Sequence, residues 1–169
     1  MQQNVLFTCA GGTLTLPPTI LNDRRDGGHL VVNPPRSVWE RSELAPLELT
    51  QWSFLVAATG RAMLDVLPQL AGGCINYWEA GNWALHDLAV PKGAKNPLEH
   101  RRVHLHVFGR SPSAGDADWQ WGESPKFPNY VDSKKWASKF ALLNHEECSA
   151  ICARVGLLLT NKYGMEKSW

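Results

Sequence analysis

Two histidines and an arginine occupy alternate positions in one short segment, residues 102–110. Arg102, His104 and His106 fall on one side of this segment, and apolar residues occupy the positions between them. A period of two is typical of a half-buried β-strand. Side chains two residues apart on one face of a strand lie about 6.5–7 Å apart, so both imidazoles can reach a single bound phosphate group. The intervening apolar residues are Val103, Leu105 and Val107.

The same two histidines allow other interpretations. Two imidazoles at this spacing are also typical of a hydrogen-bonded surface pair or of part of a metal site. A metal site would combine His104 and His106 with His86, His100 and Asp87, which together offer imidazoles and a carboxylate. This spacing matches no compact zinc signature, so the pattern favours phosphate chemistry over a metal centre.

Length and composition indicate a single α+β domain covering residues 1–169. Hydrophobic residues make up 44% of the 169 residues and charged residues 20%, which is ordinary for a globular protein. The formal net charge of +1 gives no reason to expect a nucleic-acid or anionic-membrane partner. Any anion must therefore be bound by a local group of residues.

The cysteines and the amino terminus predict a cytoplasmic protein. The four cysteines form no CxxC pair, and reduced thiols are the expected state. Residues 1–10 lack a basic region and a long apolar run, so no signal peptide and no transmembrane span are expected.

The pattern along the chain predicts an antiparallel sheet of about five strands with a central packing helix and C-terminal helices. Helical spacing of apolar residues runs from Pro46 to Pro68, and Asn144 with Glu147 resembles a capping box at the start of the last helix. A short helix is expected at residues 133–140. Strands followed by a helix, more strands and terminal helices favour the α+β class. The strand-like segments are residues 5–9, 13–16, 29–32, 74–78 and 102–110.

These residues resemble a known family, the histidine triad superfamily. Its motif alternates three histidines with apolar residues, and residues 102–108 are similar to it; Asn76 and the Gly81-Asn82 turn precede them as in the family. Residues 23–34 resemble the family's upstream strand. The resemblance covers about residues 20–112 and leaves 113–169 as a Trp-rich segment with helices. The loop at His86 and residues 119–123 look like bacterial diadenosine-tetraphosphate-hydrolase-like proteins of this superfamily.

The resemblance implies roles for four residues. His104 falls on the middle histidine, the nucleophile that attacks an α-phosphorus and forms a nucleotidyl-histidine intermediate. His106 falls on the third histidine, which contacts phosphate and assists the leaving group. Asn76 matches the asparagine that hydrogen-bonds the phosphate, and Asn82 falls where the family often offers a polar side chain to phosphoryl oxygens.

The upstream block implies a ribose contact. Asp23 or Asn22 would bind the ribose hydroxyls, although an aspartate here is also typical of a turn cap. His29 is expected to be structural. The resembled family pairs through its central helix and sheet edge, so a homodimer is implied, with a purine nucleotide or dinucleoside polyphosphate as ligand.

The sequence departs from the family at the first histidine, where Arg102 stands. Arginine holds a phosphate with two hydrogen bonds and stabilises developing charge, but it cannot accept a hydrogen bond as an imidazole does. His86 and His100, in a loop longer than the family's, are candidate substitutes. Trp119 either stacks on a base or packs under the loop.

The predicted function is therefore a nucleotide hydrolase or transferase that cleaves a phosphoanhydride or phosphoramidate bond at the α-phosphate. Arg102, His104 and His106 are its predicted catalytic residues. No metal is required, although the nucleotide substrate can carry Mg²⁺. Two alternatives remain open at this stage: a nucleotide-binding or sensing protein with weak or no turnover, and a metal protein built on the histidine cluster.

Overall fold

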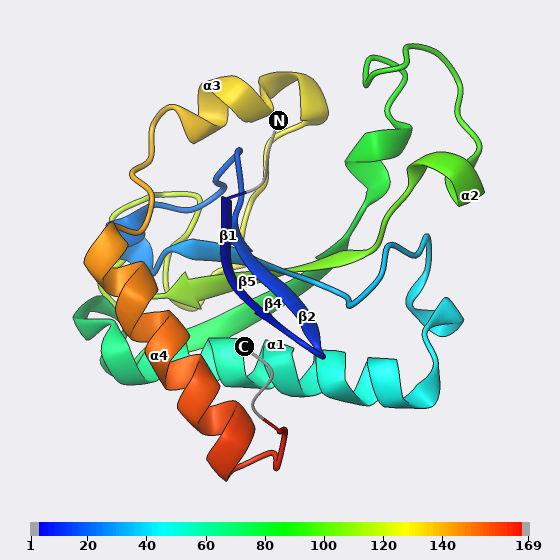
Figure 1. The fold of residues 1–169 in the computed structure, drawn as a ribbon. Coiled ribbons are helices and arrows are strands. Elements are labelled where there is room, and N and C mark those ends of the chain that lie inside the picture. Colours follow the sequence, from blue (N-terminus) through cyan, green and yellow to red (C-terminus); the bar gives the residue numbers. More distant parts are fainter. Residues whose placement is uncertain (1–3, 167–169) are drawn as a thin grey trace.

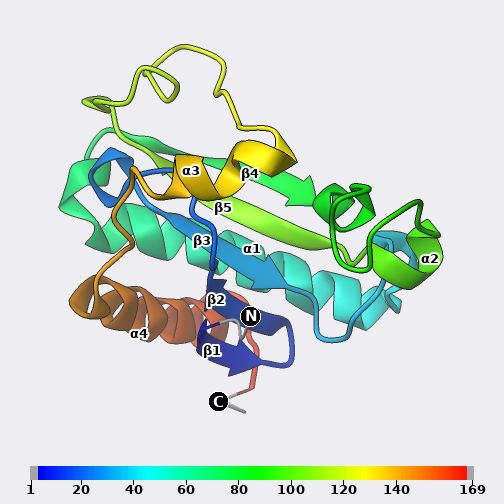
Figure 2. The same cartoon turned by 90° about the horizontal axis from the view of Figure 1, so that it is seen from above.

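A five-stranded antiparallel sheet forms the centre of the protein in a computed structural model that describes residues 4–166. The strand order is β1-β2-β3-β5-β4, and Figure 2 shows the strands side by side in this order. The α+β class and the five strands are as predicted. The strands are β1 (Asn4–Cys9), β2 (Gly12–Leu16), β3 (His29–Asn33), β4 (Cys74–Ala80) and β5 (His104–Arg110).

Four helices accompany the sheet, and Figure 1 shows α1 below it and α3 above it. Helix α1 begins at Pro46, and the Glu48 carboxylate accepts from the Ala45 amide at 2.8 Å. The predicted capping box of α4 is confirmed, because Asn144 and Glu147 cap each other's amides. No helix within residues 4–166 has the length and apolarity needed to cross a membrane. The helices are α1 (Pro46–Val66), α2 (Pro97–His100), α3 (Ser133–Ala137) and α4 (His145–Asn161).

One face of the sheet packs on α1 and α4. Val103, Leu105 and Val107 point to this face and are buried in the main hydrophobic cluster, which confirms the predicted period of two. Helices α1 and α4 contribute Leu55 and Ile151 to the same cluster, and both are fully buried. The apolar side of β5 is thereby fixed, so its alternate residues must point to the opposite face.

The opposite face carries a second, smaller cluster around Phe108. Leu21, Phe108 and Trp119 form its buried centre. The Arg110 guanidinium lies 5.1 Å from the centre of the Trp119 ring and holds the following segment by donating to the Gln120 and Glu123 carbonyls. The histidine face of β5 is thus partly covered by residues 111–137, which sequence periodicity did not predict.

Several element boundaries differ from expectation, and the helix expected at residues 133–140 ends at Ala137. Strand β5 starts at His104, so Arg102 lies before the strand, and β4 continues to Ala80. A short helix, α2, interrupts the segment expected to be a loop, because the Asn96 side chain accepts from the Leu98 amide and Pro97 takes the first helical position. The four cysteines form no disulfide.

The backbones at Gly27 and Gly109 pass very close to each other where the turn before β3 meets the end of β5. Gly27 has φ +129°, and a Cβ at this position would lie 2.3 Å from the carbonyl carbon of Gly109. The neighbouring Gly109 amide donates to the Gly28 carbonyl at 3.0 Å. This contact between backbones holds the β3 turn against β5.

We therefore expect Gly27→Ala to lower the free energy of unfolding by about 3–4 kcal/mol, from overpacking together with positive φ. Gly93→Ala is the matched control, because Gly93 has φ +104° but open space around its Cα. It should cost only about 1–2 kcal/mol. Urea unfolding of both variants measures the difference, and equal losses would show that the close approach contributes nothing.

Candidate functional site

Three imidazoles meet on the covered face of the sheet. The antiparallel register places Val31 of β3 and Trp78 of β4 on either side of His106, and Ala80 beside His104. His29, the first residue of β3, pairs with Phe108 and stacks on its ring with centroids 4.4 Å apart. The sheet register therefore brings His29 to the two histidines of β5.

A continuous hydrogen-bond chain links these rings. The Leu21 amide donates to His29 Nδ1 at 3.2 Å. His29 Nε2 lies 2.8 Å from His106 Nδ1, and His106 Nε2 lies 3.1 Å from His104 Nε2. At the other end, His104 Nδ1 lies 3.1 Å from the Arg102 carbonyl oxygen. Each ring uses both of its nitrogens in this chain, which we call the imidazole chain (His29, His106 and His104).

The hydrogen-bond partners at the two ends of the imidazole chain lead to one consistent placement of the ring protons. A backbone amide only donates, so His29 Nδ1 must accept, and His29 then carries its proton on Nε2. A carbonyl only accepts, so His104 carries its proton on Nδ1 and leaves a lone pair on Nε2. His106 fits both neighbours when it accepts at Nδ1 and donates from Nε2. Nε2 is therefore the unprotonated nitrogen of His104, as a nucleophile requires.

Burial keeps these rings neutral. Desolvation lowers the pKa of His106 to about 3, with a smaller contribution from the charge on His104. The pKa of His29 is lowered well below its usual range by complete burial and by the two other histidines. Burial also lowers the pKa of His104. All three imidazoles are thus uncharged near neutral pH, and the lone pair of His104 is available.

His104 and His106 line a cavity of about 680 Å³. Its volume suits a mononucleotide-sized ligand. Strands β2 and β3 form one side of the cavity and the end of β4 with the following turn forms the other. Residues on the first side include Thr15, Pro17, Leu21 and Val31, and residues on the second include Trp78, Asn82, Trp83 and Ala84.

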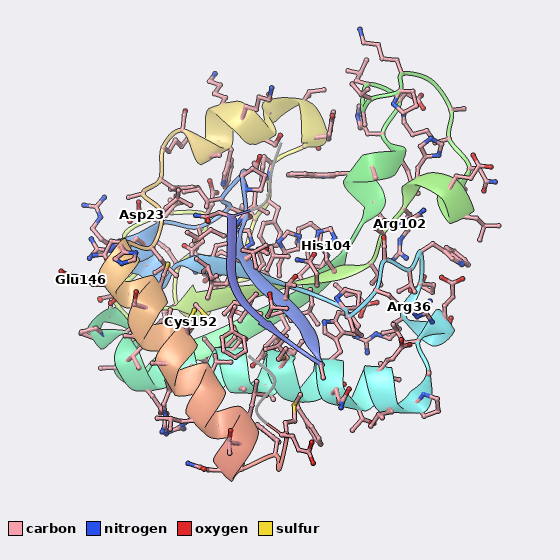
Figure 3. The ribbon with its side chains drawn as sticks, in the orientation of Figure 1. Asp23, Arg36, Arg102, His104, Glu146 and Cys152 are labelled. Carbon is pink, nitrogen blue, oxygen red and sulfur yellow. The ribbon has the colours of Figure 1, made fainter. Side chains whose placement is uncertain are left out.

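Arg102 also lines this cavity. Its side chain is exposed, and Nη1 donates to the carbonyls of Leu98 and Arg101. Within residues 4–166, its Nε and Nη2 make no hydrogen bond and it has no carboxylate partner. Figure 3 shows Arg102 and Arg36 on the same side of His104, and both residues line the cavity. The structure therefore brings Arg102, His104 and His106 together.

The two predicted phosphate-binding asparagines lie in different places. Asn82 lines the cavity, and its Oδ1 accepts from Arg101 Nε at 3.2 Å. Asn76 does not line it, because it pairs across the sheet with Phe108, four residues along β4 from Ala80. That separation is about 13 Å along the strand. The Asn76 Oδ1 atom is buried and has no hydrogen-bond partner within the described chain.

Asn22 and Asp23 lie outside the cavity lining. Asn22 Nδ2 donates to the Gly109 carbonyl at 2.9 Å, five residues along β5 from His104. Asp23 is the N-cap of a 3₁₀ turn and accepts from the Arg25 and Ala141 amides. Both are buried and are used for local structure, so the geometry supports the turn-cap interpretation rather than a ribose contact. Figure 3 shows Asp23 and Arg102 on opposite sides of His104.

The three candidate loop residues also differ in position. Trp119 is 2% exposed and donates from Nε1 to the Gly109 carbonyl at 3.1 Å, so it packs under the loop and cannot stack on a base. His86 stacks on Tyr130 with centroids 4.4 Å apart and does not line the cavity. His100 does line it, and its Nδ1 lies 3.2 Å from the Asn96 carbonyl.

Two cavity residues, Trp78 and Arg36, have positions in the site that the sequence did not predict. Trp78 stacks on His106, with ring centroids 5.3 Å apart, and on Phe127, with ring centroids 4.7 Å apart. Nothing in the sequence predicted Phe127 as its partner. Arg36 follows a double proline, and no pattern in the sequence linked it to the site.

No group of three or more His, Cys, Asp or Glu residues in the described part of the chain is arranged to hold a metal ion. Of the two loop histidines in the metal interpretation, His86 stacks on Tyr130 away from the cavity, whereas His100 lines the cavity with Nδ1 facing the Asn96 carbonyl. The structure gives that interpretation no ligand set.

No family model and no curated protein matches this chain. A solved structure does: a histidine triad protein from Sinorhizobium meliloti aligns with a TM-score of 0.52, over 91% of this chain and 87% of that one, at 20% identity. The chain has the histidine triad fold. In this histidine triad fold the imidazole chain lies on the central strands, with the cavity above them. At this level of identity the similarity establishes the architecture and leaves the chemistry to the site.

Proposed function

We propose that this protein is a nucleotide hydrolase or transferase that cleaves a phosphoanhydride or phosphoramidate bond at the α-phosphate of a purine nucleotide. The observation that carries the proposal is the His104 imidazole, which lines the cavity with its proton fixed on Nδ1 by a backbone carbonyl. A neutral imidazole with its lone pair on Nε2 is ready to attack phosphorus without a separate base.

His106 assists this attack in the proposed mechanism. In the free protein its Nε2–H points at His104 Nε2. When a phosphate enters, this N–H can turn to a phosphoryl oxygen, which releases the lone pair of His104 and neutralises charge on the phosphate. His29 keeps His106 in the donating tautomer through the 2.8 Å contact.

The remaining cavity residues supply binding. Arg102 and Asn82 line the same cavity as His104 and are proposed to hold the phosphate oxygens, and Pro17, Leu21 and Val31 offer an apolar surface to the nucleoside. A dinucleoside polyphosphate is the proposed preferred substrate, as the resemblance to diadenosine-tetraphosphate-hydrolase-like proteins implies. The proposal includes a homodimer formed through α1 and the edge strand β4, where Tyr77 is 49% exposed.

Covalent trapping tests this proposal. The protein is incubated with α-labelled diadenosine tetraphosphate, quenched in alkaline denaturant to preserve a phosphorus–nitrogen bond, digested and mapped by mass spectrometry. We expect nucleotide on the peptide that contains His104, together with released mononucleotide. Tight nucleotide binding with neither label nor product would refute the enzyme and leave a nucleotide-binding or sensing protein.

A further inference from the structure

Four rings form a closed cycle of contacts that includes His106. Trp78 and Phe108 each stack on the His106 ring, with ring centroids 5.3 Å and 5.7 Å away. Phe127 contacts both of these neighbours, since its ring centroid lies 4.7 Å from that of Trp78 and 5.4 Å from that of Phe108. We call this arrangement the ring cycle (His106, Trp78, Phe127 and Phe108). The two rings that stack on His106 therefore share one partner, which comes from outside the sheet.

The ring cycle restrains the plane of the His106 ring. Phe108 is nearly parallel to His106, with an interplanar angle of 7°, and Trp78 is tilted by 24°. Phe127 in turn stacks on Trp78 at 20°. Stacked aromatic rings prefer defined offsets and angles, so a change in one ring of the cycle alters the others. The plane of His106 decides where its Nε2–H points.

Phe127 belongs to the ring cycle but not to the cavity. His106 and Trp78 line the cavity, whereas Phe108 is fully buried and Phe127 is not part of the lining. Phe127 is therefore placed to affect the orientation of His106 without touching a ligand. Within the described chain, the hydrogen bonds of the His106 ring are those with His29 and His104.

The segment that carries Phe127, residues 111–129, has neither helix nor strand, and two buried charged side chains anchor it. The Asp26 carboxylate accepts from two successive amides of this segment, at 2.8 Å and 3.1 Å. The Arg110 guanidinium donates to two of its backbone carbonyls. These anchors determine the path of the segment over the sheet, so the Phe127 ring reaches Trp78 and Phe108 at a defined position.

From this arrangement we infer that Phe127 is a positioning residue for the proposed reaction, because it holds Trp78 and Phe108 against His106 and so keeps the His106 Nε2–H directed at the reacting site. This inference rests on the proposed function and adds to it a residue from outside the sheet and the cavity. The effect passes from Phe127 through its two ring neighbours to His106.

The ring cycle also excludes water from His106. The titratable groups that meet this ring are His104 on its own strand and His29 on β3, whereas β4 meets it with the Trp78 ring. Burial is the main cause of the lowered pKa of His106, and the charge on His104 is the smaller cause. Loss of the Phe127 ring should therefore be visible at His106 without any substrate.

Truncation of the Phe127 ring tests the inference. In Phe127→Ala, the pKa of His106 should rise by at least about 1 unit toward its ordinary value of 6.5, because water reaches the ring. Nitrogen chemical shifts measure this pKa and should show mixed tautomers of His106 at neutral pH. With diadenosine tetraphosphate as substrate, kcat should fall by about 10–100-fold, as expected for a misplaced catalytic group. Nucleotide affinity should stay near that of the wild type, because Phe127 does not line the cavity.

Two further variants at the same position separate ring geometry from apolar volume. Phe127→Tyr keeps the ring and should retain the kcat and the His106 tautomer of the wild type. Phe127→Leu restores apolar volume without a flat ring, so it should recover more of the His106 pKa than of kcat. If Phe127→Ala does not fold, Phe127→Leu carries the same test.

Phe140→Ala is the matched control. Phe140 is half-buried like Phe127, but its ring contact is with Trp136, 6.1 Å away, outside the ring cycle. This variant should leave the His106 pKa, the tautomer and kcat as in the wild type.

The outcomes separate the inference from the proposed function. A Phe127→Ala variant with lowered thermal stability but unchanged His106 pKa, tautomer and kcat would overturn the inference, because Phe127 would then be purely structural. Equal changes at His106 in Phe140→Ala would also overturn it. A wild-type protein without turnover would refute the proposed function, whereas a shifted His106 pKa in Phe127→Ala would still support the positioning of the ring.

Discussion

Replacing His104 with alanine should lower kcat/KM for diadenosine tetraphosphate by at least about 10³-fold and abolish covalent label. Losses of this size are expected when the nucleophile of a two-step reaction is removed, because the remaining groups bind and polarise the substrate but form no intermediate. The lone pair of His104 faces Nε2 of His106, and both residues line the cavity that would receive the phosphate. The rates are measured by product release and by protein-bound label in the same samples.

His100→Ala is the matched control for that variant. His100 lines the same cavity but lies outside the imidazole chain, so its removal should change anhydride cleavage by less than about 10-fold. Nucleotide affinity and thermal unfolding of both variants separate lost chemistry from lost structure. Turnover that survives in His104→Ala would assign the chemistry to another residue.

The part of the site that could be predicted from the sequence is the part set by local alternation. The period of two in β5 placed Val103, Leu105 and Val107 in the core and aimed His104 and His106 at the opposite face. The position of Trp78 beside His106 was not predicted, because it follows from the register of β4 against β5 and not from alternation within one strand. Such patterns survive folding because one face of the sheet must be buried.

The rest of the site depends on contacts between distant segments. Asn76 has the correct face but the wrong position along β4, since its partner is Phe108 and not His104. The Asp23 carboxylate accepts a hydrogen bond from the Ala141 amide, which is 118 residues away in sequence. The role of His29 in the imidazole chain follows from the pairing of β3 with β5, which one sequence alone does not reveal.

The cover over the histidine face is likewise non-local. Residues 111–128 have no helical or strand periodicity, so only the folded chain shows that Trp119 fills the second cluster and that Phe127 stacks on Trp78. This cover has a chemical consequence. It removes water from His106, and desolvation is the main cause of its lowered pKa.

Acid should therefore destabilise this protein strongly. The pKa of His106 is about 3 in the folded chain against an ordinary value of 6.5, so the unfolded chain binds the proton more tightly. The contribution of the neutral ring to stability is complete above pH 6.5 and is lost as the pH falls toward 3. At pH 5, which is 1.5 units below the ordinary value, His106 alone should cost about 2 kcal/mol. The lowered pKa of His29 acts in the same direction.

Urea unfolding between pH 7.5 and pH 4.5 measures this effect. The free energy of unfolding should fall by about 1.4 kcal/mol per pH unit for each imidazole that is held neutral. His106→Gln should reduce the slope of the free energy of unfolding against pH by the contribution of one imidazole, about 1.4 kcal/mol per pH unit. The same change at exposed His145 should leave the slope as in the wild type. In the folded protein, nitrogen chemical shifts of His29 and His106 should report Nε2–H tautomers, and His104 an Nδ1–H tautomer. If His106 of the folded protein protonated near pH 6.5, the imidazole chain would not be buried as described. The tautomer that leaves the lone pair on His104 Nε2 would then be wrong as well.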